Sequence, residues 1–98
     1  MSLEIIWSPR SENEFAKILE YIAGQWNNQV TLNFIDSLDD VLSHIAKNPL
    51  MYPVFDKKRK IHKCVLNKQI TLFYRVKRKR IEVAALFDTR QNPEKLKL

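Results

Sequence analysis

This sequence contains two runs of consecutive basic residues, whose side chains are well suited to bind a negatively charged partner. Lys57-Lys58-Arg59-Lys60 precedes one apolar segment, and Lys77-Arg78-Lys79-Arg80 separates the next two. Lysine and arginine bind phosphates and carboxylates, and a basic surface raises the encounter rate with polyanions and acidic proteins. The residues that we expect to bind a phosphate or an acidic target are Lys57, Lys58, Arg59, Lys60, Arg75, Arg78, Arg80 and Arg90.

The basic residues are concentrated in the second half of the 98-residue chain. Residues 1–56 carry three basic and eight acidic side chains, net −5, whereas residues 57–98 carry fourteen and three, net +11. The simple alternative is that lysine-rich loops are solvated and keep strand edges from aggregating. Because both runs flank strands of one predicted sheet, and Arg75 and Arg90 add to them, we favour a bound ligand.

Three segments rich in β-branched and aromatic residues, 61–66, 70–76 and 81–87, predict an antiparallel meander. We expect Arg78-Lys79 to form the last turn, although a four-residue loop over 77–80 keeps the same pairing. On the core face the predicted pairs are Val76 with Ile81, Tyr74 with Val83 and Leu72 with Ala85. On the opposite face they are Arg75 with Glu82, Phe73 with Ala84 and Thr71 with Leu86. Which face His62, Lys63 and Cys64 take is left open.

The first half of the chain predicts a short strand over 3–7 and two helices. Ser8 is a suitable N-cap, with Pro9 in the first helical turn, and Asn48-Pro49 ends the second helix. Residues at helical spacing form two apolar stripes: Phe15, Ile18, Leu19, Ile22 and Trp26, then Val30, Phe34, Leu38, Val41, Leu42 and Ile45. Residues 48–56 are predicted to be a rigid connection, and 94–98 to form at most one helical turn.

The predicted fold is therefore a single α+β domain over residues 1–98 with element order β-α-α-β-β-β. A helical hairpin packs on one face of a small, mainly antiparallel, four-stranded sheet, and the other face is cationic and partly uncovered. The single cysteine, Cys64, allows no internal disulfide. Because the start has no signal-like pattern and the longest apolar run, 83–87, is too short to span a bilayer, we expect a cytoplasmic protein without membrane contact. No motif for a nucleotide, another small-molecule cofactor or a metal is present.

The order of these elements resembles the ParE/RelE toxin superfamily of type II toxin–antitoxin modules. Ile6-Trp7-Ser8-Pro9 is similar to the ParE-like opening, Leu19-Glu20-Tyr21-Ile22 to its first helix, and Asn48-Pro49 with Tyr52-Pro53 to its linker. Thr71-Leu72-Phe73-Tyr74-Arg75-Val76 and the segment 85–93 resemble the last two strands. The resemblance implies a toxin neutralised by a cognate antitoxin, with either DNA gyrase or the ribosome and its messenger RNA as target.

The presence or absence of residues suited to RNA cleavage bears on the choice between these two targets. Cutting RNA through its 2′-hydroxyl requires a base, an acid and cations, for which His62, Arg75 and Arg90 are the candidate catalytic residues and Tyr74 a further acid–base candidate. The similar ribosome-dependent nucleases have an arginine where this chain has Thr71, and a tyrosine or histidine near Asp88-Thr89. Both departures favour a ParE-like toxin directed at gyrase. The alternatives are a RelE-like ribosome-dependent endoribonuclease and a non-toxic, basic nucleic-acid-binding domain.

Overall fold

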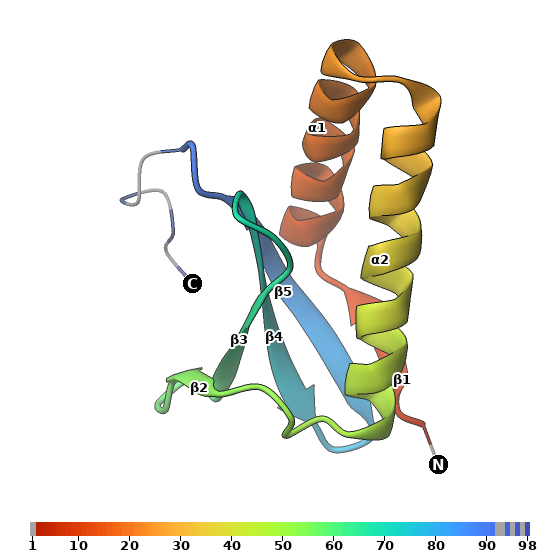
Figure 1. The fold of residues 1–98 in the computed structure, drawn as a ribbon. Helices are drawn as coiled ribbons and strands as arrows, with labels where there is room; N and C mark the ends of the chain where they lie inside the picture. Colours follow the sequence, from red (N-terminus) through yellow and green to blue (C-terminus); the bar gives the residue numbers. More distant parts are fainter. Residues whose placement is uncertain (1, 92–93, 95, 97) are drawn as a thin grey trace.

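A computed structural model describes residues 2–91, 94, 96 and 98 of the chain. Its elements are β1 (Glu4–Trp7), α1 (Pro9–Gln25), α2 (Asn28–Lys47), β2 (Val54–Asp56), β3 (Ile61–Val65), β4 (Ile70–Lys77) and β5 (Arg80–Asp88). The sheet order is β1-β5-β4-β3-β2, with β1 parallel to β5 and the other pairs antiparallel. Both helices lie on one face of this sheet (Figure 1), which confirms the predicted α+β arrangement.

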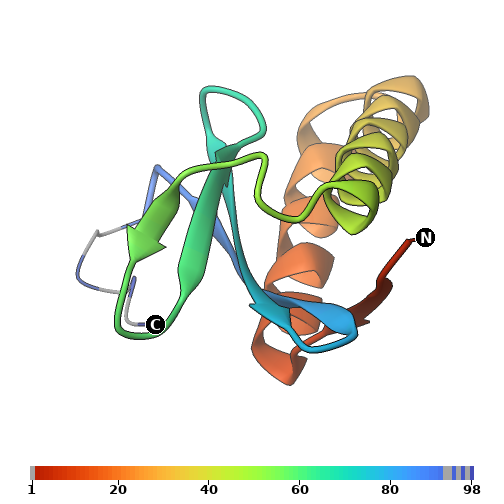
Figure 2. The same ribbon diagram turned by 90° about the horizontal axis from the view of Figure 1, so that it is seen from below.

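The sheet has five strands, so the predicted count of four was wrong by one. The segment taken as a rigid connection contains β2, which pairs with the beginning of β3 through Val54 with His62 and Asp56 with Ile61. Three residues are too few for a period of two to be recognised, and Pro53 immediately before them is typical of a loop or an edge strand. Figure 2 shows β2 at the outer edge of the sheet, on the side away from the helices.

The helix boundaries follow from capping. The Ser8 hydroxyl accepts the backbone N–H of Ser11 at 3.0 Å, and Pro9 occupies the first turn, where its missing N–H is not needed. Asn27 caps α2 in the same way by accepting the Val30 N–H at 3.0 Å. Only Trp26 and Asn27 therefore separate the helices, and the chain reverses into the predicted hairpin.

The main core lies between the helical hairpin and the sheet. From the predicted stripes, Ile18, Phe34, Leu38, Leu42 and Ile45 are buried there, against Leu72, Tyr74, Ile81 and Val83 of the sheet. Trp26 and Val30 are exceptions, with 61% and 39% of their surface exposed. They lie at the tip of the hairpin, which extends beyond the sheet (Figure 1), so no strand is available to cover them.

The β4–β5 register changes at a bulge. Val76 pairs with Ile81, Arg75 with Glu82 and Tyr74 with Val83, as predicted, and Arg78-Lys79 form a two-residue turn without the longer loop. Beyond the irregularity after Phe73 the predicted pairs are wrong by one residue. The observed pairs there are Phe73 with Ala85, Leu72 with Leu86 and Thr71 with Phe87. Ala84 is the extra residue, and it lets both Leu72 and Leu86 reach the helix side.

The face of the sheet away from the helices differs from the prediction. Its centre is a second apolar cluster of Ile61, Phe73, Ala84, Ala85 and Phe87, with Leu96 and Leu98 packed against it. The expectation that this whole face is cationic was therefore wrong, because the basic residues gather at turns. The predicted terminal turn falls partly on residues 95 and 97, outside the described part. In β3, Cys64 belongs to the helix-side core, which settles the face that the sequence left open.

Candidate functional site

The two basic runs lie at the same end of the sheet. Lys57 to Lys60 connect β2 to β3, and Arg78 and Lys79 connect β4 to β5. Because Ile61 pairs with Arg75, and Lys77 with Arg80, both turns project beyond the sheet in one direction. We call this surface the basic end. Its exposed residues are Lys57, Lys58, Arg59, Lys60, Lys77, Arg78, Lys79 and Arg80.

The β2–β3 turn has an unusual backbone for a lysine-rich sequence. The Asp56 carboxylate accepts the backbone N–H of Arg59 at 3.1 Å, and the Lys60 N–H donates to the Lys57 carbonyl at 3.4 Å. Lys60 has a φ of 56°, in the left-handed region where glycine and asparagine are preferred. The turn thus holds four cations at its tip although one of them occupies a disfavoured conformation.

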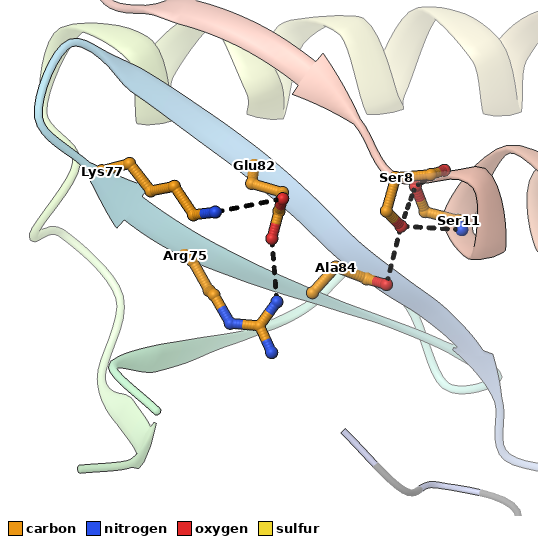
Figure 3. Close-up of polar contacts among 6 residues, drawn as sticks. All are labelled: Ser8, Ser11, Arg75, Lys77, Glu82 and Ala84. Carbon is orange, nitrogen blue, oxygen red and sulfur yellow. Dashed lines mark hydrogen bonds and ion pairs between the residues drawn. The ribbon is translucent and has the colours of Figure 1, made fainter. Parts of the chain in front are cut away.

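Arg75 lies on the open face beside the basic end and is not free. Its Nη1 donates to Glu82 Oε1 at 2.8 Å, and Lys77 Nζ lies 3.4 Å from Oε2 of the same carboxylate (Figure 3). Desolvation acts to raise the pKa of Glu82, but the hydrogen bonds from Arg75 and Lys77 outweigh it and lower that pKa. Glu82 therefore stays ionised near neutral pH and holds Arg75 in place.

His62 lies on the face of the sheet that the helices cover, and its side chain is buried. It is 6% exposed, its ring stacks on Tyr74 with 5.0 Å between centroids, and Nδ1 lies 2.8 Å from the Tyr52 carbonyl oxygen. Tyr74 in turn donates its hydroxyl to the Pro49 carbonyl at 2.9 Å. Burial raises the pKa of Tyr74 to about 12, so its hydroxyl is poorly suited to act as a base near pH 7. Both rings tie the 48–53 connection to the sheet.

Arg90 lies at the opposite end of β5 from Arg80. Eight residue steps of about 3.3 Å separate the two ends of this strand, roughly 25 Å. The Arg90 guanidinium stacks over the Tyr21 ring, 3.7 Å from its centroid, and pairs with both oxygens of Asp88. The hydrogen bonds from Arg90 lower the pKa of Asp88. The predicted site residues consequently do not form one constellation.

A polar cleft between α1 and the end of β5 is a feature that the sequence did not indicate. It has a volume of about 470 Å³ and is lined by Glu14, Lys17, Tyr21, Asp88 and Arg90, among others. Here β1 no longer covers β5, and α1 supplies the hydrogen-bond partners instead. The Ser8 hydroxyl donates to the Ala84 carbonyl (Figure 3), and the Glu14 carboxylate accepts the Leu86 N–H at 3.1 Å. Helical spacing alone could not reveal that Glu14 faces a strand edge.

The described residues contain neither a metal centre nor a helix suited to a bilayer. No three histidine, cysteine, aspartate or glutamate side chains among them are close enough to hold a metal ion. Burial raises the pKa of the Cys64 thiol, which keeps it protonated inside the core. No helix in the described part is both long and apolar enough to cross a membrane.

Comparison with solved structures places the fold among the toxins of toxin–antitoxin modules. The chromosomal ParDE system from P. aeruginosa superposes with a TM-score of 0.73 at 10% identity, covering 89% of this chain and 96% of that chain. The YoeB/ParE toxin from Agrobacterium tumefaciens gives 0.66 at 13% identity, covering 88% and 98%. The E. coli DinJ-YafQ toxin–antitoxin complex gives 0.62 at 10% identity, covering 92% and 96%. These likenesses establish the fold alone.

The sequence itself identifies the family. The family model described as the ParE toxin of the type II toxin–antitoxin system, parDE, matches residues 5–93. The chain therefore belongs to the ParE toxin family of type II toxin–antitoxin systems. No curated protein sequence matches it significantly.

Proposed function

We propose that this ParE-family toxin arrests growth by acting on DNA gyrase and that it does not cut RNA. The observation that supports the proposal is that the candidate catalytic side chains are already engaged in contacts within the protein. Arg75 and Arg90 are paired with carboxylates, and His62 packs between the Tyr52 carbonyl and the Tyr74 ring. The positions where similar nucleases have an arginine and a terminal base are taken by the buried Thr71 and by Asp88-Thr89.

RNA cleavage needs an acid and a base on opposite sides of one phosphate. His62 lies on the helix side of β3, whereas Arg75 lies on the open face, and Arg90 lies past the far end of β5. These three candidates do not converge on a position where one phosphate could sit. A target bound by surface contact is therefore the better explanation of the arrangement.

The second candidate is a RelE-like, ribosome-dependent endoribonuclease. The basic end favours it, because eight exposed cations at one end of the sheet could hold ribosomal or messenger RNA. The same feature would serve a non-toxic nucleic-acid-binding domain. Such a domain would bind more weakly as salt rises and would leave growth unaffected.

The partner that we assign to the toxin is a cognate antitoxin, in a complex that forms in the cytoplasm. A groove of about 220 Å³ runs between α2 and the β3–β4 turn, and its lining is mixed: apolar Phe34, Leu38, Val41 and Leu66, and polar Asn33, Ser37 and Asn67. The edge of the sheet also exposes Val54, Phe55 and Val65, each about half or more. A disordered, acidic and amphipathic antitoxin segment would bury these apolar residues and pair with nearby cations.

The decisive experiment separates the two targets. The chain is induced in cells without an antitoxin, and the purified protein is added to a gyrase supercoiling assay and to a translation extract. We expect growth arrest, inhibited supercoiling and intact messenger RNA. Unaffected gyrase would refute the proposal, and cuts positioned at codons only when ribosomes are present would establish the second candidate.

Variants test which residues contact the target. Arg90→Gln and Arg75→Gln each remove one paired cation, and Lys57→Gln with Lys58→Gln removes two unpaired ones. We expect the lysine pair to weaken gyrase inhibition more than either arginine change. An equal loss in all of them would indicate that bulk charge, and not a defined surface, decides toxicity. Co-expression of a cognate antitoxin should restore growth.

A further inference from the structure

We propose that the basic end binds the phosphate backbone of duplex DNA, a contact of the toxin's own that does not require gyrase. The two turns that form this surface come from neighbouring hairpins of one sheet, β2–β3 and β4–β5. Their register places both at the same end. Residues that are about twenty positions apart in the sequence thus lie at the same end of the sheet.

Most of the charge of this surface has no ion-pair partner among the described residues. In the part of the chain that the structure describes, no ion pair involves Lys57, Lys58, Arg59, Lys60, Arg78, Lys79 or Arg80. The Glu82 carboxylate is already bound by Arg75 and Lys77, and the Asp56 carboxylate caps the Arg59 backbone. Seven exposed cations therefore remain available to a polyanion.

The backbone of the β2–β3 turn indicates that charge, and not turn formation, accounts for its sequence. Lys60 occupies a left-handed conformation in which glycine or asparagine is more stable. Unfavourable local conformation of this kind concentrates at functional sites. The two turn residues between β4 and β5, Arg78 and Lys79, have no positive φ, so their backbone accepts most residue types, and both are cations.

The shape of the basic end suits a duplex better than a single strand. Centres of neighbouring hairpins lie two strand spacings apart, about 10 Å, which is close to the roughly 12 Å width of the major groove of B-DNA. The turns contain no aromatic residue on which unpaired bases could stack, as most single-strand binders require. The major groove of duplex RNA is deep and narrow, so its phosphates match this spacing less well.

The test is fluorescence anisotropy of a labelled 20-base-pair DNA duplex with the full-length chain, without gyrase, over a series of salt concentrations. Two variants remove two charges each from the basic end, Lys57→Gln with Lys58→Gln and Arg78→Gln with Lys79→Gln. The matched control, Lys17→Gln with Lys68→Gln, removes the same charge from exposed positions elsewhere. We expect each basic-end pair to weaken binding about tenfold or more and to lower the salt slope by about 1.8, and the control to change affinity less than about threefold.

Several results would overturn the proposal. These are an equal loss in the control, no measurable binding by the unchanged protein at low salt, and tighter binding of single-stranded or duplex RNA of the same length. Circular dichroism of each variant shows whether it is folded. The outcome is independent of the gyrase assay, since DNA binding by the basic end can hold or fail whether or not supercoiling is inhibited.

Discussion

The two ends of β5 place the same kind of side chain in opposite surroundings. At the end that begins with Arg80, the cations of the basic end are exposed, and apart from Lys77, which pairs with Glu82, none has an ion-pair partner among the described residues. At the other end Arg90 is held by Asp88 and stacked on Tyr21. A count of basic residues treats these arginines alike. Their surroundings indicate that the contacts of Arg90 stabilise the fold. Arg78 and Arg80, in contrast, lower its stability because they repel the neighbouring cations.

Substitutions at the two ends should therefore act in opposite directions. Changes at the α1–β5 end should lower the free energy of unfolding and leave DNA binding unchanged. Changes that remove repelling charges or the left-handed lysine from the basic end should raise the free energy of unfolding and weaken DNA binding. If substitutions at both ends change stability and DNA binding in the same direction, the two ends do not differ in the way described.

The largest expected effect is that of Glu14→Ala. Its carboxylate accepts the N–H of Leu86, a residue that is 2% exposed and lies where β1 no longer pairs with β5. Leaving a buried donor unsatisfied costs about 1 to 3 kcal/mol, which urea unfolding would measure. Glu14→Gln keeps an acceptor oxygen and should recover most of the loss. Equal stability of the alanine variant and the unchanged protein would show that α1 does not stabilise the bulge.

A smaller loss, which depends on pH, is expected from Asp88→Asn. Because Arg90 lowers the folded-state pKa of Asp88, the carboxylate contributes stability that is complete above its unfolded pKa of about 3.9. That contribution is lost as the pH falls through the lowered pKa. The difference in unfolding midpoint between the two proteins should be largest near pH 7 and shrink below about pH 4. Asp39→Asn, an exposed change on α2 that removes the same charge, is the matched control, and a trend as large in this variant would contradict the prediction.

At the basic end, the combined change Arg78→Gln with Lys79→Gln should stabilise the protein. It removes two charges from a surface where like charges repel, each worth a few tenths of a kcal/mol, so we expect a gain of about 0.5 to 1 kcal/mol. Thermal unfolding would detect it as a higher midpoint. A gain in stability together with weaker DNA binding would separate the role of this turn from that of the Asp88 end. A lower midpoint would contradict the idea that these residues are unfavourable for the fold.

The smallest expected gain comes from Lys60→Gly. Glycine relieves the left-handed conformation, worth about 1 to 2 kcal/mol, but its greater freedom in the unfolded chain returns about 0.5 to 1 kcal/mol of that. A net stabilisation of roughly 0.5 kcal/mol should appear in urea unfolding. Lys58→Gly removes the same charge from a turn residue whose φ is not positive, and it should not stabilise.

Much of the fold could be predicted because local patterns carry it. The Ser8-Pro9 start, the apolar stripes and the pairing of Tyr74 with Val83 all depend on residues near one another in sequence or on one hairpin. The bulge at Ala84 could not be predicted, because the β5 edge there is hydrogen-bonded by Ser8, the N-cap of α1, and by Glu14 of α1, both more than seventy positions away. The strand β2 was missed for a similar reason, since its existence depends on the edge that β3 offers.

The sequence by itself determined the helical hairpin, the meander, the abundance of cations in the second half and the resemblance to ParE toxins. Only the tertiary structure decided which cations are engaged and which remain free. The physical reason is distance. Composition and periodicity act over a few residues, whereas the partner of a charge is whatever the fold brings within about 4 Å of it. Thus the fold brings the Tyr21 ring, 69 positions away in the sequence, against the Arg90 guanidinium and leaves Arg80 exposed to solvent, although both arginines lie at the ends of one strand.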